Sequence, residues 1–162
     1  MKEIRAAVLT VSDGAHHGTR VDKSGPALVE RLRLAGFAVS GPAVIPDERD
    51  QIAAWLQAVI KDRSADVVFT TGGTGIAPRD VTPEAVRDVI EREIPGFGEL
   101  MRQAGRASTP FASLSRGMAG VAGTVLIVTL PGSPKGALES LGAILELVQH
   151  VHDLLNGRTA HE

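Results

Sequence analysis

The chain has 162 residues, no cysteine and nearly balanced charge, with 17 Lys and Arg against 19 Asp and Glu. It therefore can form neither disulfides nor thiolate metal sites, and it lacks the basic surplus typical of nucleic-acid-binding proteins. The first apolar run, Ala6 to Val11, is too short for a membrane span or a signal peptide, so we expect a cytoplasmic protein without a membrane partner.

Short apolar runs alternate with segments of helical periodicity along the chain. In chain order, we expect strands at 4–11, 37–45, 66–71 and 124–130. Helices are expected after the N-cap candidates Ser24, Asp47, Thr82 and Ser133, with a further helix at 99–107. The segment 105–123 is rich in Ala, Gly and Ser, and a short helix near Ser113–Ala119 is the candidate there.

The strand candidates are continuously apolar rather than alternating, which is typical of parallel strands buried on both faces. We therefore predict an α/β fold, a three-layer α/β/α sandwich around a mostly parallel central sheet. The chain length fits one domain. We assign it to residues 1–157 and expect a short polar tail at 158–162.

A glycine-rich segment follows the third predicted strand and precedes a predicted helix. It contains Gly72, Gly73 and Gly75, and Asp80 follows shortly after. Glycines at a strand-to-helix turn let the backbone bend tightly and leave N–H groups free to bind an anion. The alternative is a turn that serves close packing only. No lysine follows as in a Walker motif, and the spacing differs from the dinucleotide motif G-x-G-x-x-G.

Four predicted loops follow the carboxyl ends of strands, and parallel strands should bring these loops to one edge of the sheet. Ligands of open α/β sheets bind at that edge. These loops are Thr10–Gly14 with Lys23–Gly25, Pro46–Glu48, Thr70–Asp80 and Leu130–Gly136. Asp47 and Asp80 are the candidates for holding Mg²⁺ beside phosphate groups. The alternatives are an N-cap role for Asp47 and a turn-forming role for Asp80.

Arg79 and Lys135 are candidates for phosphate contacts, with solvated surface residues as the alternative.

Other catalytic signatures are absent from the sequence. His150 and His152 are two residues apart and do not share a helix face, and no H-x-x-x-H pair indicates zinc. The hydrolase motif G-x-S-x-G is missing as well.

Six segments come in a distinctive order. They are Thr-Val-Ser-Asp at 10–13, Asp-Lys-Ser-Gly-Pro at 22–26, Pro-Asp-Glu at 46–48, the glycine-rich segment at 70–84, Leu-Ser-Arg-Gly at 114–117 and Leu-Pro-Gly-Ser-Pro-Lys-Gly at 130–136. This set resembles the molybdenum cofactor biosynthesis family of the MogA/MoaB type over nearly the whole chain. The resemblance implies a homotrimer, or a dimer of trimers (a hexamer), with small-molecule substrates and a possible hand-over of product to a metal-insertion protein.

The resemblance also implies a molybdopterin adenylyltransferase that uses Mg²⁺, ATP and molybdopterin. The family's two essential aspartates match Asp47 and Asp80, with the implied role of holding Mg²⁺ and orienting phosphates. The matching substrate-binding residues are Ser12, Asp13, Thr71, Gly72, Gly73, Thr74, Gly75, Ser115, Pro131, Gly132 and Ser133. The alternatives are a non-catalytic molybdopterin-binding or carrier protein of the MoaB branch, and an oligomeric scaffold.

Overall fold

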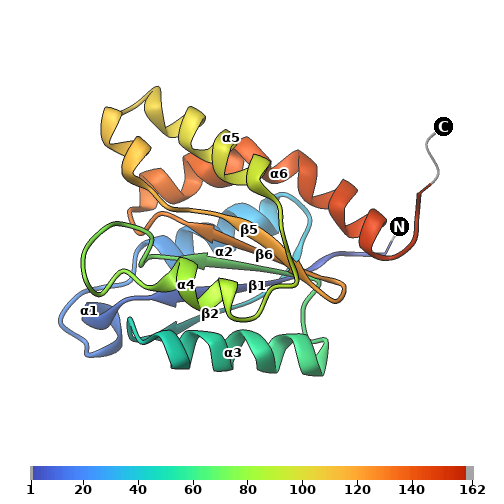
Figure 1. Cartoon of the computed structure of the whole chain (residues 1–162), viewed down its shortest axis with the longest axis horizontal. Helices are drawn as coiled ribbons and strands as arrows, with labels where there is room; N and C mark the ends of the chain where they lie inside the picture. The colour runs from blue at the N-terminus through green and yellow to red at the C-terminus, as the bar shows by residue number, and fades with distance from the viewer. Residues whose placement is uncertain (1, 160–162) are drawn as a thin grey trace.

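A computed structural model describes residues 2–159 as a six-stranded sheet with helices on both faces (Figure 1). The strand order is β2-β1-β3-β6-β5-β4. The strands are β1 (Arg5–Val11), β2 (Ala38–Ile45), β3 (Val67–Thr71), β4 (Arg92–Glu93), β5 (Ala119–Ala122) and β6 (Val125–Leu130). The helices are α1 (Asp13–His16), α2 (Ser24–Leu34), α3 (Arg49–Asp62), α4 (Thr82–Arg87), α5 (Pro95–Arg106), the 3-10 helix η1 (Pro110–Leu114) and α6 (Pro134–Leu155).

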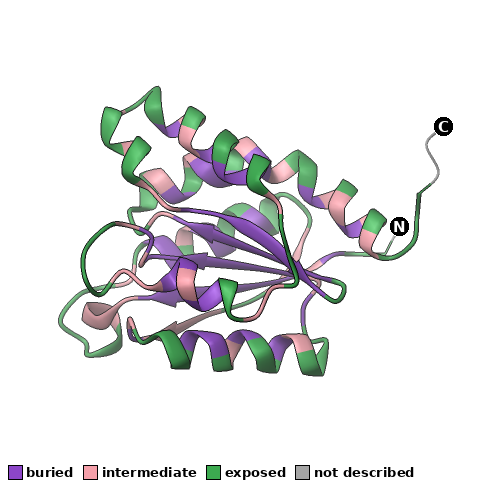
Figure 2. Cartoon of the chain, viewed as in Figure 1, coloured by how far each residue is buried: buried purple, intermediate pink, exposed green. Residues whose placement is uncertain are grey.

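The predicted three-layer α/β/α sandwich is confirmed by two separate apolar clusters. One packs α2, α5 and α6 against the sheet, and the other packs α3 and α4 against its opposite face. Alternate residues of β1 enter the two clusters, Val8 the first and Leu9 the second. Figure 2 shows the consequence: the central strands are buried along their length, while the helices are buried only along one stripe. Within residues 2–159, no helix is long and apolar enough to cross a membrane.

The sheet is mostly parallel, as predicted, but one edge is antiparallel. Strands β2, β1, β3 and β6 run parallel, whereas β5 pairs antiparallel with β6 and β4 pairs antiparallel with β5. The expected helix near Ser113–Ala119 is wrong. Those residues leave η1 and enter β5, which turns back on β6 through Gly123 at φ 56°. The segment Ala-Gly-Val-Ala has too little side-chain pattern to reveal a strand, because its stability comes from pairing with β6.

Three of the four expected N-caps are wrong. Ser24 is the first helical residue of α2, and Asp22 accepts the hydrogen bond from the Gly25 N–H group instead, at 3.0 Å. Thr82 is buried and donates its hydroxyl to the Gly72 carbonyl at 3.0 Å. Only Ser133 caps as predicted, accepting from the Gly136 N–H group at 3.1 Å. The Thr82 side chain thus bonds to another loop, whereas at the start of α2 the neighbouring Asp22 accepts the hydrogen bond expected for Ser24.

The ends of the elements follow the prediction closely in most places. Gly36, at φ 91°, follows the last turn of α2 as a glycine terminator. Helix α4 ends at Arg87, and α5 begins at Pro95, four residues before the expected start at 99. The tail predicted at 158–162 lies outside the described residues after 159, and Arg158 still donates its N–H group to the Asp153 carbonyl at 2.8 Å.

Candidate functional site

The four predicted loops meet at the carboxyl ends of the parallel strands. They line a cavity of about 730 Å³, which we call the carboxylate cavity. Its lining includes Thr10, Ser12, Asp22, Lys23, Asp47, Thr71, Gly72, Gly73, Asp80, Gly132 and Ser133. The predicted meeting of these loops is therefore confirmed, because parallel strands present all their carboxyl ends at the same edge of the sheet.

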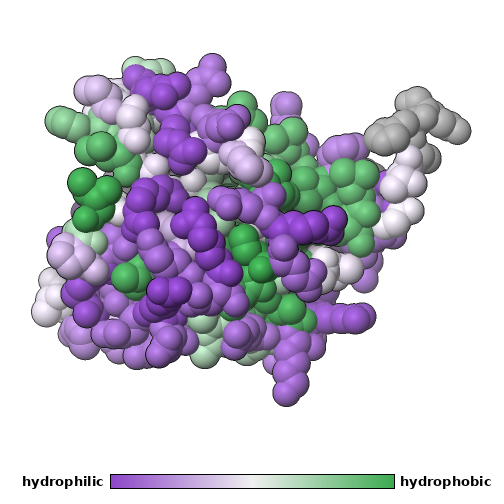
Figure 3. Space-filling view, viewed as in Figure 1, coloured by the Kyte–Doolittle hydropathy of each residue, from purple (hydrophilic) through white to green (hydrophobic). Residues whose placement is uncertain are grey.

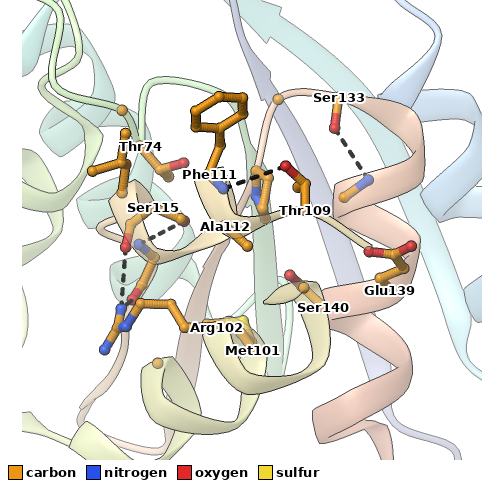
Figure 4. Close-up of a pocket in the computed structure, with 18 of the residues that line it drawn as sticks. Thr74, Met101, Arg102, Thr109, Phe111, Ala112, Ser115, Ser133, Glu139 and Ser140 are labelled. Carbon is orange, nitrogen blue, oxygen red and sulfur yellow. Dashed lines mark hydrogen bonds between the residues drawn. The ribbon is translucent and has the colours of Figure 1, made fainter. Parts of the chain in front are cut away.

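A second cavity, of about 430 Å³, adjoins the first and shares Gly132 and Ser133 with it. We call it the apolar cavity, because Ile76, Met101 and Phe111 contribute to its lining. Figure 4 shows it between α5, η1 and the start of α6. The predicted residues Thr74, Gly75, Ser115 and Pro131 line this cavity and not the carboxylate cavity. The predicted substrate-binding residues are thus divided between two adjoining cavities, except Asp13, which lines neither.

Ser115 is held in place by its neighbours. Its hydroxyl accepts from the Gly117 N–H group at 3.3 Å, and its carbonyl accepts from Arg102 at 3.3 Å (Figure 4). Arg102 also donates to the Gly117 carbonyl at 3.1 Å. Within residues 2–159, the Arg102 side chain hydrogen-bonds to these carbonyl groups only, and it lines the apolar cavity together with the charged side chain of Glu139.

The glycine-rich loop has the backbone of an anion cradle. Gly72 and Gly73 adopt φ of 101° and 68°, which side chains disfavour. The carbonyls of Gly72–Gly75 all accept hydrogen bonds, from Thr82 or from Arg116. The N–H groups of residues 73–76 donate to no atom of the described chain. Because the carbonyls are engaged and the N–H groups are free, the loop can receive the oxygens of a phosphate group.

Asp47 is not an N-cap. Glu48 occupies the cap position of α3 without a side-chain hydrogen bond, while Asp47 accepts from the Asp13 N–H group at 2.9 Å. Asp13 in turn accepts from the Asp47 N–H group at 3.0 Å. This reciprocal pair joins the first and second loops and holds the Asp47 carboxylate beside Gly73. Burial raises the pKa of Asp47, and the negative charges of Asp13 and Asp80 act in the same direction.

Asp80 both forms a turn and faces the carboxylate cavity. Its Oδ2 accepts from the Ala77 N–H group at 3.0 Å, and its own N–H group donates to the Ala77 carbonyl at 2.9 Å. Its Oδ1 accepts no hydrogen bond from residues 2–159. Asp80 therefore forms a turn through Oδ2, and its Oδ1 remains free for a ligand.

The two aspartates fit a magnesium ion bound together with substrate. Asp47 lies close enough to Asp80 for the second charge to raise the pKa of the first. No group of three His, Cys, Asp or Glu residues that could hold a metal occurs within 2–159. Mg²⁺ uses one or two carboxylates together with phosphate oxygens and water, so this pair suits it without a cage built entirely of protein.

The predicted phosphate contacts Arg79 and Lys135 line neither cavity. Arg79 donates to both oxygens of Asp13, at 2.5 and 3.0 Å, and to Glu48 at 2.8 Å. This pairing lowers the pKa of Asp13 to about 2. Lys135 is exposed and lies 3.9 Å from Glu139.

Sequence reasoning assigned no role to two cations that do line the carboxylate cavity, Arg20 and Lys23. Lys23 belongs to the segment Asp-Lys-Ser-Gly-Pro at 22–26, which carried part of the family resemblance. Lys23 could therefore have been identified from that segment. No quoted segment contains Arg20, and the path of its loop depends on the fold.

We expect Asp47→Asn to raise the melting temperature in metal-free buffer at pH 7, by about 2 °C. A carboxyl whose folded pKa is raised destabilises the folded state as the pH climbs above its unfolded pKa of about 3.9. The amide has no such ionisation, and its oxygen can still accept from the Asp13 N–H group. The difference from the parent should therefore grow between pH 4 and pH 8 in a thermal unfolding series. A variant that melts below the parent at pH 7 would contradict this electrostatic account.

Comparison with known proteins identifies the group to which this arrangement is related. A family model described as a probable molybdopterin binding domain matches residues 7–150. A protein of Helicobacter pylori strain J99, named molybdopterin adenylyltransferase, is 41% identical over 159 residues, covering 97% of this chain and 90% of that protein. An Escherichia coli K12 protein of the same name is 42% identical over 147 residues, covering 89% and 75% respectively.

Solved structures agree over almost the same length. The molybdopterin biosynthesis enzyme MoaB from Thermus thermophilus is 47% identical, with a TM-score of 0.87, and the match covers 95% of this chain and 97% of that one. A Pyrococcus furiosus MoaB, described as a tungsten cofactor synthesizing protein, is 34% identical with a TM-score of 0.85, covering 98% and 99%. The same three-layer fold thus occurs in structures that share a third to a half of the sequence.

Proposed function

The chain belongs to the molybdopterin-binding family of the MogA/MoaB type, and we propose that it transfers AMP from Mg-ATP to the terminal phosphate of molybdopterin. In this reaction a phosphate oxygen of molybdopterin bonds to the α-phosphorus of ATP. The bond from that phosphorus to the oxygen bridging to the β-phosphate breaks. Adenylylated molybdopterin and pyrophosphate leave. The attacking phosphate is already anionic near neutrality, so the reaction needs no protein base.

One observation carries the proposal: two carboxylates from different loops converge on a glycine loop with free N–H groups, at the junction of two cavities. Two substrates can then place their phosphate ends at the junction and their ring systems in separate cavities. The N–H groups of residues 73–76 orient the phosphate oxygens, and Lys23 adds positive charge to the carboxylate cavity.

Asp47 and Asp80 are the residues that would hold Mg²⁺. When bound, the ion neutralises charge on the polyphosphate and favours departure of pyrophosphate. The protein's own contribution is positional. The reciprocal hydrogen bonds between Asp13 and Asp47 hold one carboxylate, and the turn from Ala77 holds the other.

The experiment that tests this proposal measures pyrophosphate release by the full chain. We expect release only when ATP, molybdopterin and Mg²⁺ are all present, with adenylylated molybdopterin formed in equal amount. Omission of any one should return the signal to background. Molybdopterin binding without pyrophosphate release would overturn the transfer reaction and favour the non-catalytic carrier instead.

We also propose that the chain acts in the cytoplasm as a homotrimer or hexamer and passes its product to a metal-insertion protein. Apolar side chains interrupt the polar surface in several places (Figure 3). Among the large apolar side chains of residues 2–159, Val21, Leu34, Ile76, Phe111 and Leu114 are the most exposed. Burial of such side chains between subunits would favour assembly. Light scattering of the purified protein distinguishes monomer, trimer and hexamer.

A further inference from the structure

Arg116 connects the glycine-rich loop to helix α4. It lies between η1 and β5 and lines neither the carboxylate cavity nor the apolar cavity. We propose that Arg116 is a positioning residue, which sets the place of the Asp80 carboxylate through the turn that carries it. The effect on catalysis rests on the proposed AMP transfer, whereas the effect on the turn does not.

The contacts of Arg116 span both ends of that turn. Its Nε donates to the Gly75 carbonyl at 2.8 Å, and its Nη2 donates to the Asp80 carbonyl at 2.7 Å. Its backbone N–H group donates to the Thr74 carbonyl at 2.8 Å. One residue, more than thirty positions away in sequence, therefore holds the start and the end of the segment from Thr74 to Asp80.

Glu84 orients the guanidinium group. It lies in the first turn of α4, and its carboxylate accepts from Nη1 and Nη2 of Arg116. The side chains of both residues are about two-thirds buried, with exposed fractions of 34% for Arg116 and 33% for Glu84. Because a guanidinium is planar and presents donors in a fixed fork, it can meet two carbonyls and a carboxylate at once. A lysine ammonium at the end of a flexible stem cannot reproduce that geometry.

These contacts act on Asp80 through the backbone. The Asp80 carboxylate closes the turn by accepting from the Ala77 N–H group, so its position depends on the positions of residues 77 and 80. Arg116 holds the carbonyl of Asp80 itself. Turning the carbonyls toward Arg116 also leaves the neighbouring N–H groups free for phosphate. Loss of the hydrogen bonds from Arg116 should therefore misplace the Asp80 carboxylate without removing any group that touches substrate.

The test compares Arg116→Lys and Glu84→Gln with the parent. Arg87→Lys is the matched control, since Arg87 is also an arginine paired with a glutamate, Glu93 at 3.5 Å, but makes no contact with the loop. The first readout is amide hydrogen exchange of the peptide spanning 75–81, in protein without substrates; within it, the N–H groups of Ala77 and Asp80 are the ones that the turn protects. The second is steady-state AMP transfer as a function of molybdopterin and of Mg²⁺.

For Arg116→Lys we expect at least about tenfold faster exchange at 75–81, with the central strands protected as in the parent. We expect kcat to fall about 100-fold, since a misplacement of about 1 Å can have that effect. The KM for molybdopterin should stay within about threefold of the parent, and the Mg²⁺ concentration for half-maximal rate should rise. Glu84→Gln should shift the same quantities in the same direction by less, and Arg87→Lys should leave them unchanged.

Unchanged exchange at 75–81 in Arg116→Lys would overturn the proposal. Faster exchange across the whole sheet would overturn it too, because Arg116 would then serve general stability. A variant that loses activity only through a higher KM for molybdopterin would place Arg116 in substrate binding instead. If the parent itself transfers no AMP, the proposed function fails, and the exchange measurement still decides whether Arg116 holds the turn.

Discussion

Replacing Asp80 by Asn should lower AMP transfer at least about 100-fold while molybdopterin still binds. The amide oxygen can still accept from the Ala77 N–H group, so the turn at 77–80 should persist. What disappears is the negative charge at the free carboxylate oxygen, which we propose as a ligand of Mg²⁺. Electrostatic groups at the reacting phosphates contribute on the order of several kcal/mol to transition-state stabilisation, which corresponds to losses of this size.

The measurement is kcat from product formation, together with molybdopterin affinity by titration calorimetry. Asp50→Asn is the matched control, because Asp50 is an exposed aspartate in the first turn of α3, three residues after Asp47. We expect the control to keep the activity of the parent. Unchanged turnover in Asp80→Asn would refute the metal role assigned to Asp80. Loss of molybdopterin binding together with turnover would indicate that Asp80 serves the pterin and not the metal.

Gly72→Ala should destabilise the fold by about 3 kcal/mol and abolish activity. The residue has φ of 101°, and an added Cβ would lie 2.2 Å from the carbonyl oxygen of Val11. That oxygen belongs to the backbone of β1, which cannot move there without disturbing the pairing of Val11 with Ile45 of β2. Backbone strain of this kind costs on the order of 1–3 kcal/mol, and the collision adds to it. A movement of Gly72 away from Val11 would also displace the free N–H groups of residues 73–76.

Gly36→Ala separates the cost of a positive φ from the cost of the collision with Val11. Gly36 has a similar φ of 91°, but an added Cβ there meets nothing within 4 Å. We expect this control to lose only about 1 kcal/mol and to keep its activity. Urea unfolding with unchanged m-values measures both free energies. Equal losses in the two variants would contradict the claim that the close approach to Val11 makes the difference.

Much of the fold was predictable because parallel strands buried on both faces are continuously apolar. The runs at 4–11, 66–71 and 124–130 identified the central strands on that ground alone. Their common direction then required the following loops to share one edge, so the meeting of Asp47 with the glycine loop could be inferred without coordinates. Strand β5, which lies between β6 and the edge strand β4, was missed, because four small residues carry no such pattern and depend on β6 for their structure.

The roles of individual polar side chains were far less predictable. Asp47 and Thr82 both occupy positions that local rules assign to helix capping, yet each side chain bonds to a distant loop. Arg79 follows the glycine loop directly and suggested a phosphate contact, but Asp13 and Glu48 hold it outside the cavities. Sequence spacing cannot settle such choices, because the partner of Thr82 lies ten residues away and those of Asp47 and Arg79 lie more than thirty residues away.

The glycine pattern at 72–75 determined by itself that a tight turn with free N–H groups follows a buried strand, since that conformation is local to the backbone. Tertiary structure alone decided how the turn is held. Arg116 reaches the Gly75 and Asp80 carbonyls from a segment that sequence could not place. It also decided that Ser115 lines a separate, apolar cavity and that Lys23 lines the carboxylate cavity. The physical reason is range: backbone conformation depends on nearby residues, whereas the partners of a polar side chain depend on which segments folding brings together.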